Sequence, residues 1–197
     1  IQSMTVQKIR LMGNPVLMSP AQPVDDPRAP EIASVIADMR DSMEAAGGIG
    51  IAAPQIGVGK RVVMFHVPTE DDGFADSTDP DHRADLMTRG LTVLINPEIE
   101  ILTDAGSNEV KDGWEGCLSV PGMRGLVPRH QHIRYRGLTP EGHRIEREAH
   151  GFHAVVVQHE CDHLDGILYP MRMTDLGSLH YVSETDAIVE AAEKEPA

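Results

Sequence analysis

The stretch VVVQHECDHLDG, residues 155–166, contains two histidines four positions apart, with a glutamate directly after the first. On a helix, residues i and i+4 lie one above the other, so His159 and His163 can both aim a ring nitrogen at one ion. Glu160 is rotated by about 100° from His159 on the helical period and can act as a base on water beside that ion. The pattern indicates the active site of a metal-dependent hydrolase.

A catalytic site of this type takes three protein ligands and leaves one position for water. In metzincin peptidases the third ligand is a histidine at the position that Tyr169 occupies here, which disfavours that family. A downstream glutamate is not excluded by spacing. Cys161 is turned by about 200° from His159 and is expected to face away, as a small buried side chain. Cys117, in the glycine-bracketed stretch GWEGCLSVPG, is expected in a sharp loop whose thiolate approaches from another element.

Local patterns predict the elements that position these residues. Apolar residues from Ile32 to Met43 follow one face of a helix that begins near Pro30 and ends at Gly47 and Gly48. The stretch GIGIAAPQIGVG, residues 48–59, is expected to be a tight loop. Further elements are a strand at 61–67, one or two strands within 91–102 with Pro97 at an edge or bulge, a hairpin from 132–138 and 143–148, and a second helix over about 151–163.

Composition limits the class of protein. With 197 residues, of which 41% are hydrophobic, the chain can bury a core in one domain, and we expect one catalytic domain over 1–197, with a core at about 6–171 and an acidic tail at 172–197. The net charge of −14 argues against a nucleic-acid substrate. The chain has only two cysteines, and no signal peptide is visible, so we expect the protein in the reducing cytoplasm. No long apolar span is visible either, so we expect no membrane partner. The acidic insert at 69–90 is expected to be an exposed loop.

Three separate segments resemble one family, the peptide deformylases. The family's pattern Gly-x-Gly-x-Ala-Ala-Pro-Gln, with apolar x, occurs as GIGIAAPQ at 48–55. Its pattern Glu-Gly-Cys-Leu-Ser occurs as EGCLS at 115–119, and Gln-His-Glu-x-Asp-His-Leu-x-Gly as QHECDHLDG at 158–166. All three stand in the family's order, and the likeness extends from about Val6 to Met171.

The resemblance implies an enzyme that removes the formyl group from the N-terminal N-formylmethionine of newly synthesised polypeptides and releases formate. It implies that Cys117, His159 and His163 are the metal ligands. It implies that Glu160 is the general acid and base. The implied donors to the developing oxyanion are the Gln55 side chain and the Leu118 backbone N–H. The implied metal is Fe²⁺, which Zn²⁺, Ni²⁺ or Co²⁺ can replace. A cysteine with two histidines suits several first-row ions, so the residues alone leave the metal open.

The resemblance also implies an apolar pocket for the methionine side chain, lined by Ile49, Gly50, Phe152, Val155 and Val156. For each of these residues taken singly, ordinary core packing is an equally good interpretation. Gly50 and Ile51 can offer backbone groups to an extended peptide that adds as a strand. Arg124 is a candidate contact for the peptide's carbonyl groups, although an exposed arginine is more often only a solvated charge.

Two alternatives to a deformylase belong to other classes. A metallopeptidase of the His-Glu-x-x-His type is weakened by Tyr169 and leaves EGCLS unexplained. A protein with a structural zinc would need a fourth protein ligand and no water position, and it would have no use for Glu160 or Gln55.

We therefore expect an α+β fold in which mixed and antiparallel strands surround a central helix with His159 and His163, and the N-terminal helix packs outside. The expected partners are N-formylmethionyl nascent peptides. Familiar bacterial members often end in a basic helix that docks on the ribosome. This chain ends in the acidic ETDAIVEAAEKEPA, which disfavours electrostatic docking on ribosomal RNA through the tail.

Overall fold

The computed structural model describes residues 5–67, 90–102 and 109–185. In chain order its elements are η1 (Pro15–Met18), α1 (Pro30–Ala45), β1 (Gly50–Ala52), η2 (Ala53–Ile56), β2 (Val62–His66), β3 (Leu91–Ile101), β4 (Val110–Cys117), β5 (Val120–His130), β6 (His132–Leu138), β7 (Arg144–His150), α3 (Gly151–Leu164), η4 (Tyr169–Met171), η5 (Leu176–Ser178) and β8 (His180–Tyr181).

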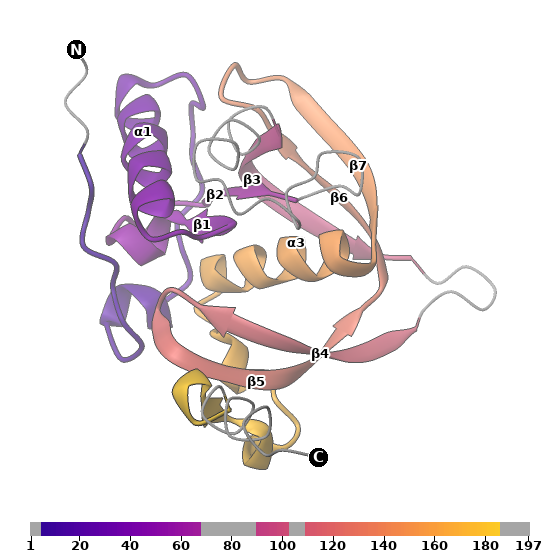
Figure 1. Ribbon diagram of the computed structural model, residues 1–197. Helices are drawn as coiled ribbons and strands as arrows, with labels where there is room; N and C mark the ends of the chain where they lie inside the picture. Colours follow the sequence, from indigo (N-terminus) through magenta and orange to yellow (C-terminus); the bar gives the residue numbers. More distant parts are fainter. Residues whose placement is uncertain (1–4, 68–89, 103–108, 186–197) are drawn as a thin grey trace, which may run out of the picture.

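Two sheets lie on either side of one central helix. The larger sheet has the strand order β1-β2-β3-β6-β7 and the smaller one β4-β5-β8, and every pairing between these strands is antiparallel. Helix α3 runs between the sheets, while α1 packs outside (Figure 1). An isolated parallel bridge joins Gln22 and Lys60. The expected α+β fold, with one central helix and the N-terminal helix packed outside, is confirmed.

Helix α3 is buried because each of its faces meets a different partner. Ala154, Val157, Cys161 and Leu164 recur at helical spacing and join the core cluster against β2, β3 and β6. The remaining face, toward the smaller sheet, carries the two histidines of the metal pattern. A helix that contacts protein on all sides has little need of a polar stripe, and α3 accordingly buries nine of its fourteen residues.

Glycines set both ends of α3. Gly151 has φ +52°, which lets the chain turn sharply from β7 into the first turn of the helix. At the other end Gly166 has φ +75°, and the N–H groups of Gly166 and Ile167 donate to the carbonyls of His163 and Asp162. This is the Schellman arrangement of a helix C-terminus. A Cβ on Gly166 would lie 3.0 Å from the Met18 backbone carbon, so the end of α3 is also held close to η1.

Helix α1 covers the opposite face of β1 and β2. Its side chains Ile32, Ile36, Met39 and Met43 form a second core cluster with alternate residues of these strands. Consequently β2 is buried on both faces, with Val63 and Phe65 toward α3 and Val62 and Met64 toward α1. The predicted helix is confirmed, including its Pro30 start and its glycine-rich end.

The predicted strands and hairpin are confirmed, and Pro97 marks a bulge. The register between β3 and β6 shifts between Ile95 and Glu98. Asn96 has φ +51°, and its side chain bonds both the N–H and the carbonyl of Val24. The bulge therefore ties β3 to the segment that leads into α1.

Two expected loops are regular structure instead. The stretch at 48–59 contains β1 and η2, because backbone pairing with β2 extends over Gly50–Ala52. The stretch GWEGCLSVPG belongs to β4 and β5, with the sharp turn confined to Leu118 and Ser119. In the first case pairing with β2 overrides the local glycine signal, and in the second the stretch forms a hairpin whose two strands pair with each other.

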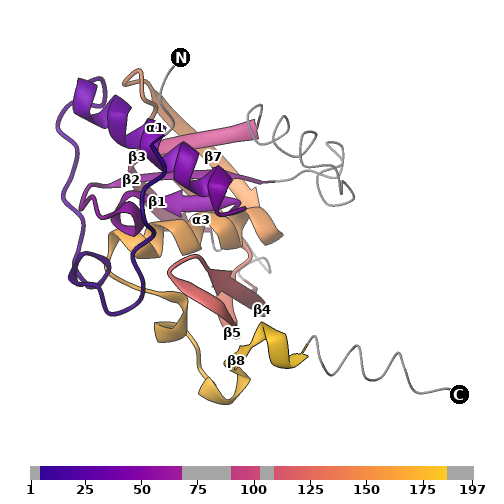
Figure 2. The same ribbon diagram turned by 60° about the vertical axis from the view of Figure 1, so that its left-hand side comes forward.

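Part of the segment expected to form a tail folds back onto the smaller sheet. Strand β8 lies beside β5 (Figure 2), where it pairs with Met123 and Arg124. The Trp114 and His180 rings meet edge to face at 5.0 Å. The acidic insert at 69–90 lies outside the described residues except for Gly90, as do residues 186–197 of the tail. Among the helices in the described ranges, none has both the length and the apolar character needed to cross a membrane.

Candidate metal and active site

Three residues from two elements converge between α3 and the smaller sheet. Cys117 ends β4, and His159 and His163 lie one turn apart on α3. The Sγ atom of Cys117 is 3.4 Å from Nε2 of His163, and one ligand atom from each of the three residues lies within 4.8 Å of the others. The structure therefore brings together the three residues that the sequence nominated as ligands.

The donor set and its spacing fit one divalent transition ion. With metal–sulfur and metal–nitrogen bonds of about 2.3 and 2.1 Å, tetrahedral geometry separates sulfur from nitrogen by about 3.6 Å, close to the distance between Cys117 and His163. In the described part of the chain this group contains no fourth protein ligand. A three-ligand set is typical of catalytic rather than structural zinc-type sites.

Glu115 fixes the orientation of the first histidine ring. Its Oε2 is 2.7 Å from Nδ1 of His159. Burial raises the pKa of Glu115, but hydrogen bonds from His159 and Arg129 outweigh this and hold the pKa below its ordinary value. An ionised carboxylate can only accept, so Nδ1 carries a proton, which leaves Nε2 as the ring nitrogen that can ligate a metal.

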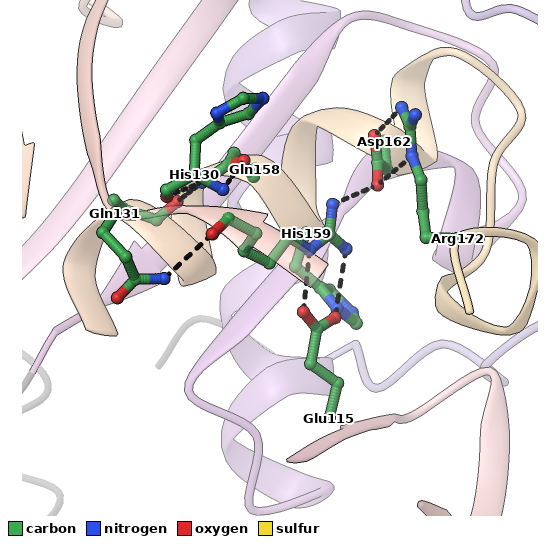
Figure 3. Close-up of polar contacts among 9 residues, drawn as sticks. Glu115, His130, Gln131, Gln158, His159, Asp162 and Arg172 are labelled. Atoms are coloured by element: carbon green, nitrogen blue, oxygen red, sulfur yellow. Dashed lines mark hydrogen bonds and ion pairs between the residues drawn. The ribbon is translucent and has the colours of Figure 1, made fainter. Parts of the chain in front are cut away.

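A buried ion network extends from this contact. Arg129 donates to both carboxylate oxygens of Glu115, at 2.7 and 3.1 Å, and to Asp162 at 2.6 Å. Arg172 then bonds the same Asp162 carboxylate at 2.8 and 3.2 Å. Figure 3 shows Glu115, His159, Asp162 and Arg172 in this continuous polar chain. Because Arg129 is only 4% exposed and pairs on both sides, the network is a rigid support for His159.

The two histidines have opposite electrostatic environments. Burial lowers the pKa of His159, but hydrogen bonds to Cys117 and Glu115 outweigh it and hold the pKa well above the ordinary value. The pKa of His163 is held well below its ordinary value, by burial and then by the positive charges of His159 and Arg129. The charged form is therefore disfavoured at His163 and favoured at His159, so metal binding, which needs both imidazoles neutral, is aided by the surroundings of His163 and opposed by those of His159.

Glu160 lies beside the ligands with little access to water. It is 5% exposed, and its Oε2 has no hydrogen-bond partner in the structure. Burial is the main cause that raises its pKa to about 7. The positive charge of His159 lowers this pKa, and the negative charge of Glu115 raises it further. A carboxyl group with a pKa near neutrality can take up and return a proton, which is the property of a general acid and base.

Gln55 is held by contacts at both ends of its amide. Its Oε1 accepts from the Ala52 N–H at 2.8 Å, and its Nε2 lies 3.2 Å from Ser119 Oγ and 3.6 Å from Cys117 Sγ. The amide N–H₂ therefore points toward the ligand cluster. Leu118 directly follows Cys117 in the turn between β4 and β5, so its backbone is also at the cluster.

A cavity of about 750 Å³ opens onto these groups. All six residues nominated for substrate binding line it, namely Ile49, Gly50, Arg124, Phe152, Val155 and Val156, together with Gln55, Cys117, Leu118, His159 and Glu160. Val156 is buried in the core as well, which agrees with its packing interpretation. Phe152 is 56% exposed and lies at the rim rather than in the core, and Arg124 is exposed at the mouth.

Cys161 and Tyr169 take no place among the candidate ligands. Cys161 is 7% exposed in the core cluster on the face of α3 away from His159, as its spacing predicted, and burial raises the pKa of its thiol. Tyr169 is buried beneath the smaller sheet, with its ring 6.4 Å from that of His159.

The supporting network was missed from the sequence, although one signal was available. Residues i and i+2 of a strand point to the same face, so Glu115 and Cys117 share a face of β4. Arg129 and Arg172 had no comparable signal, because their partners lie on other elements.

Comparison with known proteins decides the family. The sequence model of the family described as polypeptide deformylase matches residues 6–178. The chain belongs to this family. Peptide deformylases are metal-dependent enzymes of protein biosynthesis that remove the formyl group from the N-formylmethionine of nascent peptides, and the metallopeptidase alternative is not favoured.

Individual peptide deformylases agree in sequence and structure. Peptide deformylase 1 of Bordetella pertussis is 51% identical over 176 residues, covering 89% of this chain and 92% of the relative. Peptide deformylase 2 of Ralstonia nicotianae is 52% identical over 170 residues, covering 86% and 88%. The Met-Ala-Ser-bound class I type b enzyme of Acinetobacter baumannii superposes with a TM-score of 0.71 at 33% identity, over 87% of this chain and 100% of that one. The actinonin complex from Synechococcus elongatus gives 0.70 at 26% identity, over 98% and 88%.

Proposed function

We propose that Cys117, His159 and His163 bind one Fe²⁺ ion and that the chain uses it to deformylate N-formylmethionyl peptides. The observation that carries this proposal is the convergence of the three ligand atoms within 4.8 Å, next to a buried Glu160 and an open cavity. Zn²⁺, Ni²⁺ or Co²⁺ also suits a thiolate with two imidazoles, and geometry and supply decide between such ions. When bound, the ion acts as a Lewis acid that makes water a nucleophile at neutral pH.

Glu160 moves the protons in this proposal. Its unpartnered Oε2 accepts a proton from the attacking water. The carboxyl group then returns this proton to the departing amine of methionine, and formate leaves. The buried position of Glu160 supports both roles, because its pKa near 7 lets the same group act as base and then as acid.

Two donors stabilise the negative charge that grows on the formyl oxygen. Gln55 presents its Nε2–H₂ from a side chain that the Ala52 N–H holds in place. The backbone N–H of Leu118 is the second donor, carried by the turn that follows Cys117. Preorganised donors of this kind are worth about 10²–10³ in kcat each.

The substrate enters as an extended chain with its methionine side chain in the cavity. Ile49, Val155 and Val156 supply the apolar wall, with Phe152 at the rim. Strand β1 lies at the edge of the larger sheet, so Gly50 and Ile51 offer backbone groups to a peptide that pairs as an added strand. Arg124, at the mouth of the cavity, faces the carbonyl groups further along the peptide.

We infer that the chain forms one catalytic domain with its core at about residues 6–171, to which Arg172 adds its bonds to Asp162, and that the enzyme works in the cytoplasm on chains that emerge from the ribosome. A net charge of −14 disfavours docking on ribosomal RNA by electrostatic attraction. Encounter with the nascent chain then depends on recognition of the formylmethionine end.

The experiment that tests this function is a paired assay on a short N-formylmethionyl peptide. Protein is purified without oxygen and reconstituted with Fe²⁺, and both formate and new internal amines are measured. Formate release without internal cleavage supports the proposal. Internal cleavage would assign the site to a peptidase instead, and the N-acetyl peptide serves as the matched control that should release nothing.

A further inference from the structure

The outward face of the larger sheet carries an ordered ladder of charges. Arg136 of β6 stands between Glu98 of β3 and Glu146 of β7, and Arg134 stands between Glu100 and Glu148 in the next row. Ion pairs join Arg136 to Glu98 at 2.9 Å and Arg134 to Glu148 at 2.7 Å. Each row therefore has the pattern Glu–Arg–Glu, which balances charge across the three strands.

The last row departs from this pattern. Where Arg and Glu would continue the ladder, His132 of β6 stands directly opposite His150 of β7. The two rings stack with centroids 3.9 Å apart and 20° between their planes. Nε2 of His132 also lies 3.4 Å from Oε2 of Glu148. Ion pairing explains the first two rows but gives no reason for two imidazoles face to face.

We propose that His132, Glu148 and His150 form a second binding site for a divalent transition ion such as Zn²⁺, separate from the catalytic cluster. One ligand atom from each residue lies within 4.8 Å of the others. Two imidazoles and one carboxylate are a common ligand set for zinc, and neutral imidazole also binds Ni²⁺ and Cu²⁺. Glu148 and His150 are exposed, so an ion reaches the site from solvent and keeps water at its open position.

Local geometry predicts how the site fills. Parallel rings point their nitrogen lone pairs in parallel, so one ring must turn before both can bind one ion. His150 is exposed and can turn, whereas His132 is 8% exposed and stays in place. Arg134 holds Glu148 through its other oxygen, Oε1, at 2.7 Å and competes with the ion for this carboxylate. The second site is therefore weaker than the catalytic one.

The position of the site gives it a structural consequence. His132 and His150 form the last pair between β6 and the edge strand β7, and His150 directly precedes the first residue of α3. An ion held there ties the edge strand to its neighbour at the point where the chain enters the metal-binding helix. Ions that bind only the folded state stabilise it by mass action.

Metal counting on the untagged holoenzyme tests the proposal. Protein is dialysed to equilibrium against buffered Zn²⁺, and zinc per chain is measured for the wild type, His150→Ala and His132→Ala. We expect two ions in the wild type and one in each variant, with formate release unchanged. One ion in the wild type, or two in both variants, would overturn the second site and leave the proposed function unaffected.

Two further variants guard this result against indirect effects. Glu98→Gln removes a carboxylate of the same charge ladder that pairs with Arg136, so it should keep two ions. Arg134→Gln removes the competitor for Glu148 and should bind the second ion more tightly. With Cu²⁺ as the probe, the second equivalent should show coupling to two imidazole nitrogens in its electron paramagnetic resonance spectrum, and the absence of nitrogen coupling would contradict the assignment.

Discussion

The Glu115 carboxylate accepts a 2.7 Å hydrogen bond from Nδ1 of His159, across 44 positions of sequence. This contact links the metal-binding helix to the strand that carries Cys117. Since Arg129 neutralises Glu115 from the other side, the ring of His159 is oriented by a buried ion network rather than by its helix alone. The geometry of the candidate metal site thus depends on residues that do not themselves bind the ion.

Replacing Glu115 by glutamine tests this dependence. The amide keeps the size of the side chain but loses the charge that stabilises both His159 and Arg129. Changes of this kind typically cost 10- to 100-fold in metal affinity, and we expect a loss in that range. Competition against a chelator of known affinity measures it. Glu109→Gln is the matched control, because within the described part of the chain the Glu109 carboxylate pairs with exposed Lys111, and equal affinities in the two variants would refute the role of Glu115.

Gly50→Ala should disable catalysis through a steric contact with Glu160. An added Cβ would overlap Oε1 of Glu160 and lie 2.7 Å from its Cδ, so the carboxylate must move. A displacement of about 1 Å at a reacting group can cost on the order of 10²-fold in rate. We expect kcat to fall by about this factor while the metal content stays at the wild-type value.

The control for this substitution is Gly59→Ala. Its Cβ would meet only Val16, at an ordinary distance of 3.9 Å, and neither Gly50 nor Gly59 has a positive φ. Gly59→Ala should therefore keep wild-type kcat. Equal rates for the two variants would show that Glu160 has room to move and that Gly50 is not needed for its position.

Metal-free protein should lose stability with rising pH because of Glu160. Burial raises its pKa in the folded state from 4.5 to about 7, so the fold favours the protonated carboxyl group. That stability is fully present below the unfolded pKa and is lost as pH rises through the folded one. Glu160→Gln removes this dependence. As pH rises from about 5 to about 8, the free energy of unfolding of the wild type should fall by roughly 2 to 3 kcal/mol relative to that of the variant.

Urea unfolding of both metal-free proteins across this range makes the measurement. The pKa of Glu115 is lowered, so its contribution to the stability of the fold is lost only as pH falls below about 4.5. This range lies below the pH range in which Glu160 acts. A constant difference between the two proteins from acid to neutral pH would mean that Glu160 is not desolvated as the structure indicates.

Elements with strong local patterns were predictable from the sequence. The apolar stripe from Ile32 to Met43 and the histidine stripe on α3 each have helical spacing, and both helices begin and end close to the predicted positions. The metal cluster followed from the same logic, since two ligands share one helix face and Cys117 was the best remaining candidate. The helices and the histidine pair depend on spacing within a few residues, whereas Cys117 lies on another element, 46 positions before His163.

Features that depend on distant partners were not predictable. The glycines of residues 48–59 suggested a loop, yet pairing with β2 makes Gly50–Ala52 a strand. Arg129 reaches Asp162 across 33 positions, and β8 returns to pair with Met123. Local composition does not indicate which segment pairs with a given strand, so these contacts could be identified only from the folded structure.

The three-ligand metal site is tested by titrating metal-free protein with Fe²⁺ under anaerobic conditions and following formate release from an N-formylmethionyl peptide. If Cys117, His159 and His163 hold the catalytic ion, the rate should rise in proportion to bound metal and level off at one ion per chain. Cys117→Ser should bind the ion weakly and stay inactive at that level. Full activity in Cys117→Ser, or formate release from protein without metal, would contradict the account.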